Sequence, residues 1–166
     1  MITRPLSDVF ARKEFQGIVS VRPSATTSEA VAVMNRSGVG AVIVIDASGQ
    51  VAGIFTERDV MRRVVGERRD ADITPVSEVM TAEVRHVPSS TTVEEALRLM
   101  VVHGYRHLLV GDGARISGVV SIRDLMRWMI MPDAPIAYEG RVGVIRQRTQ
   151  DALSALQPID EPPITH

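Results

Sequence analysis

The sequence contains no cysteine. Disulfide bonds, thiolate metal sites and cysteine nucleophiles are therefore excluded. Aromatic residues make up only 4% of the chain, so the core has to be built mainly from Val, Ile, Leu, Met and Ala. Lysine occurs once, as Lys13, and the other cationic residues are arginine. Arginine suits phosphate and carboxylate oxygens better than lysine does, but a genome-wide codon bias would give the same count.

Excess charge and long apolar runs are also missing. The formal net charge is −1, which argues against a strongly basic nucleic-acid binder or a polybasic membrane binder. No apolar run approaches the length of a membrane span, and residues 1–5 lack the pattern of a secretion signal. We therefore expect a cytoplasmic protein. The 166 residues, 45% of them hydrophobic, suffice for one ordinary domain or two very small ones.

Two segments of the chain repeat each other. Residues 26–30 (Thr-Thr-Ser-Glu-Ala) align with residues 92–96 (Thr-Val-Glu-Glu-Ala). The same spacing pairs further identical residues: Met34 with Met100, Gly38 with Gly104, Val44 with Val110 and Asp46 with Asp112. After a one-residue adjustment in a turn, Gly53-Ile54-Phe55-Thr56 meets Gly118-Val119-Val120-Ser121, and Arg58-Asp59 meets Arg123-Asp124. So many spaced matches indicate an internal duplication.

Each repeat predicts the order β-α-β-β-α. A strand leads into a Pro/Ser/Thr cluster and an amphipathic helix, which ends at a glycine suited to a left-handed cap. A hairpin of two strands and a closing helix follow. In the first repeat the strands are expected at 18–21, 41–45 and 51–55, and the helices from the cluster to Gly38 and at 57–65. In the second repeat the strands are expected at 84–87, 107–110 and 116–120, and the helices from the cluster to Gly104 and at 122–130.

The expected fold class is α/β (α+β), with two repeats related by a pseudo-twofold axis. Neither repeat alone buries enough surface to be comfortably stable, so we expect the two sheets to pack face to face and to leave two related clefts. The expected segments are an N-terminal segment packing on the module (1–16), repeat 1 (17–66), a linker (67–75), repeat 2 (76–131) and a C-terminal region (132–166). That last region is expected to hold an amphipathic helix at about 139–156 and a frayed end.

The duplicated segments resemble the CBS-domain family, tandem modules named after cystathionine beta-synthase. The resemblance covers roughly residues 6–131. It rests on the lead-in Val76-Ser77-Glu78-Val79-Met80-Thr81, on Thr92–Ala96, on Tyr105–Val110, on Gly118–Asp124 and, in the first repeat, on Gly53–Asp59. The first lead-in, Leu6-Ser7-Asp8-Val9-Phe10, departs from the pattern and stands four residues further from its repeat.

The resemblance implies a regulatory module rather than an enzyme. It implies an adenine nucleotide (AMP, ADP or ATP) as regulatory ligand, with no obligatory cofactor, a homodimer, and an effector protein that receives the signal. Asp59 or Asp124 would hold the ribose hydroxyls, and Thr56 or Ser121 would contact phosphate or ribose. The full implied ligand-binding set is Thr56, Arg58, Asp59, Arg106, His107, Ser121, Arg123, Asp124, Val21 and Val87.

Two of these motifs have a purely structural interpretation. Thr56-Glu57-Arg58-Asp59 and Ser121-Ile122-Arg123-Asp124 fit the capping box of a helix N-terminus, which needs no ligand. The interpretations are compatible, because one helix start can be capped and can also bind a phosphate.

The two clefts should differ in charge. Arg106 and His107 stand at the start of a strand where relatives place basic residues against phosphate. The equivalent positions in the first repeat are Gly40 and Ala41, which carry no charge. We therefore expect the cleft of Asp59 to be better equipped for phosphate than the cleft of Asp124.

The residues leave three function classes open: a ligand sensor, an empty structural dimerisation module, and a small nucleotide-processing enzyme. NADH and S-adenosylmethionine remain alternative adenosyl ligands. Catalysis finds little support, because the chain has no Gly-x-Ser-x-Gly elbow, P-loop or His-Glu-x-x-His motif. His103 and His107 have the spacing of a zinc pair, but Gly104 should end the helix between them. We expect no metal.

Overall fold

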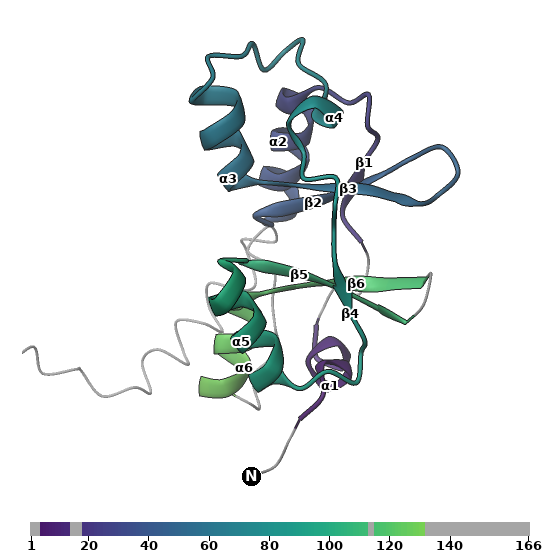
Figure 1. The fold of residues 1–166 in the computed structure, drawn as a ribbon, viewed down its shortest axis with the longest axis vertical. Helices are drawn as coiled ribbons and strands as arrows, with labels where there is room; N and C mark the ends of the chain where they lie inside the picture. Colours follow the sequence, from purple (N-terminus) through teal and green to yellow (C-terminus); the bar gives the residue numbers. More distant parts are fainter. Residues whose placement is uncertain (1–3, 14–17, 113–114, 132–166) are drawn as a thin grey trace, which may run out of the picture.

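A computed structural model describes residues 4–13, 18–112 and 115–131. The expected C-terminal helix and tail lie outside these residues. The chain forms two three-stranded sheets, and Figure 1 shows them stacked face to face in the middle of the molecule. Helices cover the outer face of each sheet, so the layers run helix, sheet, sheet, helix (Figure 1). The predicted fold class is confirmed.

The two sheets have the same topology. In the first, β1 (Ser20–Val21) runs parallel to β2 (Ala41–Ile45), which is antiparallel to β3 (Val51–Thr56). In the second, β4 (His86–Val87), β5 (His107–Asp112) and β6 (Arg115–Ser121) repeat this arrangement. The hairpin strands match the predicted ranges to within two residues. Only the last two residues of each predicted first strand pair as a strand.

Helices α2 (Thr27–Ser37) and α5 (Val93–His103) begin and end where their local sequence requires. Thr26 and Glu29 form a capping box, in which the Thr26 N–H donates to the Glu29 carboxylate at 2.8 Å. Gly38 ends α2 with φ 63°. This left-handed conformation suits glycine because it has no Cβ. Gly104 ends α5 in the same way, with φ 68°.

The closing helices of the two repeats differ. In the second repeat α6 (Ile122–Ile130) is a regular α-helix over the predicted range. In the first, α3 (Glu57–Asp59) is a single turn that continues as a π-helix, η1 (Val60–Val65). A Cβ at Gly66 would lie 2.6 Å from the carbonyl oxygen of Arg62, so glycine allows the backbone to close on itself there. The prediction of one plain helix over 57–65 was wrong in this respect.

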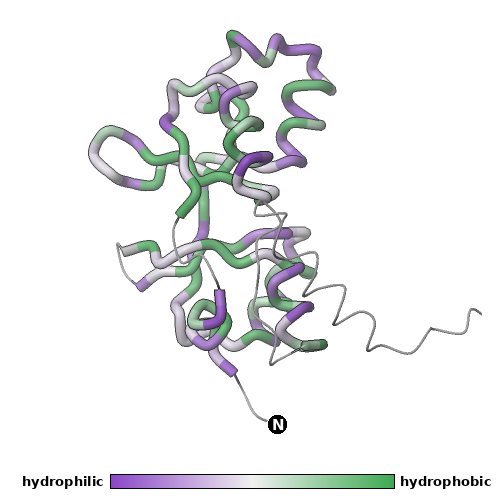
Figure 2. The backbone as a smooth tube through the Cα atoms, turned by 180° about the vertical axis from the view of Figure 1, so that it is seen from behind, coloured by the Kyte–Doolittle hydropathy of each residue, from purple (hydrophilic) through white to green (hydrophobic). Residues whose placement is uncertain are grey.

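Three apolar clusters hold the layers together. Alternation along each strand divides its side chains between two faces. Val42 and Val44 of β2 pack under the helices, while Ala41 and Ile43 face the second sheet. Between the sheets, the four buried residues of the seam are Ala41, Ile43, Ile54 and Leu109. Figure 2 shows hydrophobic residues concentrated along the strands, whereas hydrophobic and hydrophilic residues alternate along the helices.

Each lead-in helix packs on the opposite repeat. The first lead-in, α1 (Leu6–Ala11), buries Leu6 and Val9 completely in the core of the second repeat. The second lead-in, α4 (Val76–Val79), buries Val76 and Val79 in the core of the first. Backbone bonds fix the exchange, with the Leu6 N–H donating to the Thr91 carbonyl at 2.8 Å. Each repeat therefore depends on a segment that precedes the other one in the sequence.

Candidate functional site

Two pockets open at the seam between the repeats, and each takes its walls from both of them. The Asp59 pocket, of about 350 Å³, lies where the start of α3 faces residues 103–108 of the second repeat. The Asp124 pocket, of about 610 Å³, lies where the start of α6 faces residues 38–41 of the first repeat. The two clefts predicted from the duplication are therefore present.

Asp59 caps the helix at whose start it stands. Its Oδ2 accepts hydrogen bonds from the Thr56 N–H at 2.9 Å and the Thr56 hydroxyl at 2.7 Å. Its Oδ1 lies 3.4 Å from Nη1 of Arg63, one turn further along. The residue is 7% exposed. The structural interpretation as a capping box is thus correct, and the same carboxylate also lines the pocket.

Arginines surround the Asp59 pocket. Five of them line it against two carboxylates, Asp59 and Glu83; they are Arg58, Arg62, Arg63, Arg85 and Arg106. Arg58 also crosses the seam, because its Nη1 donates to the Gly104 carbonyl at 2.8 Å. This excess of guanidinium groups favours an anionic ligand with oxygens arranged for bidentate contacts.

Two rings lie at the edge of the same pocket. His103 and Tyr105 are stacked with their centroids 5.3 Å apart, and both line the Asp59 pocket. Tyr105 is 42% exposed. An aromatic face of this kind can stack on a heterocyclic base. His103 is therefore part of a ring pair, and in the described segments of the chain no group of three or more metal-ligating side chains occurs.

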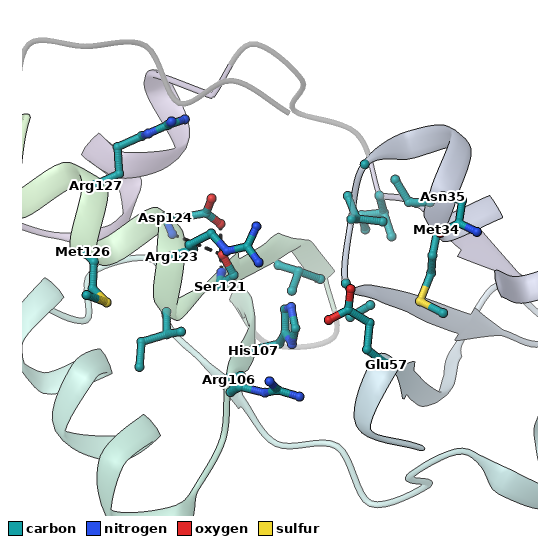
Figure 3. A pocket seen from close by; sticks show the side chains of 18 of the residues that line it. Met34, Asn35, Glu57, Arg106, His107, Ser121, Arg123, Asp124, Met126 and Arg127 are labelled. Carbon is teal, nitrogen blue, oxygen red and sulfur yellow. Dashed lines mark hydrogen bonds between the residues drawn. The ribbon is translucent and has the colours of Figure 1, made fainter. Parts of the chain in front are cut away.

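In the Asp124 pocket, Figure 3 shows Ser121, Arg123 and Asp124 on one side and Glu57 with Asn35 on the other. Oδ2 of Asp124 accepts from the Ser121 N–H at 2.8 Å, and the Ser121 hydroxyl accepts from the Asp124 N–H at 3.1 Å. The pocket faces Gly40 and Ala41, as predicted.

Gly40 matters because the Glu57 side chain lies against it. A Cβ at position 40 would lie 3.0 Å from the nearer carboxylate oxygen of Glu57. Glycine therefore makes room for this carboxylate, which reaches into the Asp124 pocket from the first repeat (Figure 3).

Arg106 and His107 stand between the pockets and line both of them. The sequence predicted that they face Asp59, and the structure places them toward Asp124 as well. The pKa of His107 is lowered from 6.5 to about 4; burial is the largest cause, Asp124 opposes the shift, and the positive charges of Arg106, Lys13 and Arg123 add to it. The imidazole is therefore neutral at physiological pH. Arg106 supplies the charge of this pair.

Two of the predicted site residues lie elsewhere. Val21 in β1 packs with the helix-side core of the first repeat, and Val87 in β4 with that of the second. Neither lines the Asp59 pocket or the Asp124 pocket. The pocket walls come instead from earlier in these segments, at Ile18 and Val19 in one repeat and at Val84 and Arg85 in the other. The reason is that the chain reaches the seam before the first strand begins, while β1 and β4 turn their valines under the helices.

One functional candidate was missed altogether. Lys13 is 4% exposed, and its Nζ lies 3.0 Å from Oδ2 of Asp124. The same ammonium donates to the Val119 carbonyl at 2.5 Å. In the sequence Lys13 stands out only as the single lysine, and composition alone does not predict that it contacts Asp124.

Comparison with known proteins agrees with this architecture. The family model of the CBS domain matches residues 7–66 and 76–131. The CBS domain-containing protein YhcV of Bacillus subtilis is 35% identical over 108 residues, which are 65% of this chain and 76% of the relative. The aligned part spans 66%, 76% and 57% of the length of three curated relatives.

Solved structures share the fold. A protein with CBS domains from Burkholderia ambifaria MC40-6 superposes with a TM-score of 0.74 at 35% identity, covering 80% of this chain and 98% of that one. The CBS domain protein PAE2072 of Pyrobaculum aerophilum, which was solved in complex with AMP, has a TM-score of 0.64 at 25% identity and covers 73% and 89%. Within the described ranges, none of the helices is long and apolar enough to cross a membrane.

Proposed function

The chain belongs to the CBS domain family, and on that premise we propose that it is a sensor whose pockets bind an adenine nucleotide: AMP, ADP or ATP. CBS pairs are regulatory modules. The observation that carries the proposal is that two equivalent carboxylates, Asp59 and Asp124, each stand at a helix start and line a pocket between the repeats.

The chemistry of each pocket suits a nucleotide. A carboxylate accepts hydrogen bonds from the vicinal hydroxyls of ribose, as acidic residues do in dinucleotide-binding folds. In both capping boxes Oδ2 of the aspartate caps the helix and Oδ1 does not, so capping and ribose binding are compatible. Arginines beside each carboxylate provide partners for phosphate. The AMP complex of the Pyrobaculum relative supports the same ligand class.

The two pockets should differ in the number of ligand phosphates that they prefer. The Asp59 pocket has five arginines against two carboxylates, whereas the Asp124 pocket has Arg106, Arg123 and Arg127 against Glu57 and Asp124. We expect the Asp59 pocket to prefer the more highly charged nucleotide. Occupancy would then pass to an effector protein through a shift in the packing of the two repeats. Under this proposal the protein acts in the cytoplasm, where these nucleotides are abundant, and it is not an enzyme.

A homodimer is part of the proposal. Large apolar side chains are exposed on η1, α5 and α6, and these helices lie on the same flank of the molecule in Figure 1. Val101 is 74% exposed and Ile130 is 71% exposed. An apolar flank of this kind is a natural interface for a second copy. Sedimentation equilibrium should show a dimer, and Val101→Arg should shift the protein toward the monomer.

Isothermal titration calorimetry tests nucleotide binding directly. AMP, ADP, ATP, NADH and S-adenosylmethionine are titrated separately into the wild type, Asp59→Asn and Asp124→Asn. Each variant should lose about tenfold in affinity at its own pocket, the scale of one charge-assisted hydrogen bond. Asp46→Asn is the matched control, because that carboxylate caps the β2–β3 turn outside both pockets.

The outcomes separate the function classes. Binding of none of the five ligands by the wild type would favour a purely structural dimerisation module. Binding of NADH or S-adenosylmethionine alone would keep the sensor and change its ligand. Product formation during incubation with ATP would point to the nucleotide-processing enzyme.

A further inference from the structure

The only lysine of the chain is buried behind the Asp124 pocket. Its side chain is 1% exposed, and Nζ lies 3.0 Å from Oδ2 of Asp124, whose side chain is 17% exposed. Lys13 also donates to the carbonyl of Val119, which lines the same pocket, and its Nζ stands 5.2 Å from the ring centroid of Phe10. A lysine is rarely buried to this degree unless its charge is matched. Here the matching charge is the carboxylate of Asp124, which lines the pocket.

The second lead-in has no equivalent of this lysine. Aligning Leu6–Phe10 with Val76–Met80 places Lys13 opposite Glu83, which lines the Asp59 pocket. The Asp59 carboxylate instead meets Arg63, a residue of its own closing helix, at 3.4 Å. The two carboxylates thus receive their counter-charges from different places. One comes from the N-terminal segment, which packs on the second repeat, and the other from η1.

We propose that Lys13 is the positioning residue of the Asp124 pocket. It fixes the Asp124 carboxylate through Oδ2, together with the Ser121 N–H, so that Oδ1 is presented to a ribose hydroxyl. It does so from outside the pocket, since it is not among the lining residues. Affinity for nucleotide at Asp124 therefore depends on the N-terminal segment, while affinity at Asp59 does not. This inference rests on the proposed function.

The physical reason is the competition between hydration and pairing. Without Lys13, the Asp124 carboxylate loses its ion-pair partner at a site with little access to water, and it can turn away from the pocket. This change removes an oriented acceptor. An interaction that orients a group before the ligand arrives saves the ligand that ordering cost.

The test uses an Asp59→Asn background, in which the Asp59 pocket is weakened and the Asp124 pocket is the tighter site. AMP, ADP and ATP are each titrated calorimetrically into this protein and into the same protein carrying Lys13→Met. We expect affinity to fall by about tenfold, as for the loss of one charge-assisted hydrogen bond. In an Asp124→Asn background, in which the Asp59 pocket is the tighter site, Lys13→Met should leave the affinity of that tighter site unchanged.

Two further variants separate positioning from general stability. Arg12→Met removes a cation from the same segment, where it lies 4.5 Å from the ring centroid of Trp128, and should leave both affinities unchanged. Lys13→Gln loses the charge but keeps a donor for Val119, and should show the same loss at Asp124 as Lys13→Met. Lys13→Gln also provides the comparison with the wild-type Lys13 if Lys13→Met fails to fold.

Equal affinities with and without Lys13 in the Asp59→Asn background, or tighter binding without it, would overturn the inference and leave the proposed function intact. So would a wild type that binds nucleotide only at Asp59. Equal losses at both pockets would reduce Lys13 to a structural residue. A wild type that binds no nucleotide would refute the proposed function and this inference together.

Discussion

Acidification should destabilise the protein through His107. The pKa of this imidazole is about 4 in the folded chain, against 6.5 for an ordinary histidine. Because the unfolded chain then binds the proton more readily than the folded one, the free energy of unfolding falls as the pH falls. The loss begins as the pH drops below 6.5 and is complete once the pH is below about 4. Above pH 6.5 the contribution of His107 is fully present.

The size of the effect follows from the shift. A displacement from 6.5 to about 4 corresponds to about 3 kcal/mol, since one pKa unit is about 1.4 kcal/mol. Burial is the largest cause. The charged groups that act on the ring are Asp124, which raises the pKa, and Arg106, Lys13 and Arg123, which lower it. They come from three different parts of the chain: the segment after α1, the start of β5 and the start of α6, so packing between distant segments keeps this histidine neutral.

Guanidinium denaturation at a series of pH values gives the measurement. The wild type is compared with His107→Gln, which keeps a polar side chain but cannot be protonated. The difference between the two profiles removes the titration of all other groups, and we expect the wild type to lose about 3 kcal/mol relative to the variant between pH 7 and pH 4. Parallel profiles would refute the assignment of a buried, neutral His107.

Three other substitutions have expected outcomes. Gly53→Ala should cost about 2 kcal/mol of unfolding free energy, as overpacking does, because its Cβ would lie 2.7 Å from the Thr81 carbonyl oxygen; Gly118→Ala should cost less, because it meets only the Phe10 ring, at 2.7 Å. Denaturation curves measure both. Arg63→Met should cost about 1–2 kcal/mol in the same assay, because Arg63 donates to the carbonyls of Val79 and Met80. Lys13→Met should raise the pKa of His107, since Lys13 lowers it, and an NMR titration of the imidazole that shows no rise would contradict this.

Much of the fold could be predicted because its signals are local. The capping box at Thr26 and the left-handed Gly38 are decided by neighbours within one helical turn. The strand at 41–45 is a short apolar run bounded by glycine and a turn. The duplication then supplied the sheet-to-sheet packing, because each half shows one apolar sheet face that needs a cover. The two pockets followed from that geometry.

The rest depended on contacts between distant segments. The lead-in at 6–10 has an apolar pattern, but nothing near it indicates that it covers the second repeat rather than the first. Lys13 meets Asp124 across more than half of the chain. The valines at 21 and 87 do not line the two pockets because their side chains turn to the helix side of each sheet, which depends on strand register.

The exchange of lead-in helices decides how ligand binding can act. The halves cannot separate without exposing Leu6 and Val9 on one side and Val76 and Val79 on the other, all of them buried. Separation is therefore too costly to serve as the response to a ligand.

The seam between the sheets is packed less extensively, because it holds four buried apolar residues, compared with ten and eight in the two helix-side cores. Both pockets open at this thin layer, and Arg106 and His107 line both of them. A nucleotide whose phosphate binds Arg106 from one pocket leaves less positive charge for a ligand in the other pocket. We therefore expect the two sites to be coupled through Arg106 and His107. We expect the accompanying movement to be a small sliding of one sheet over the other.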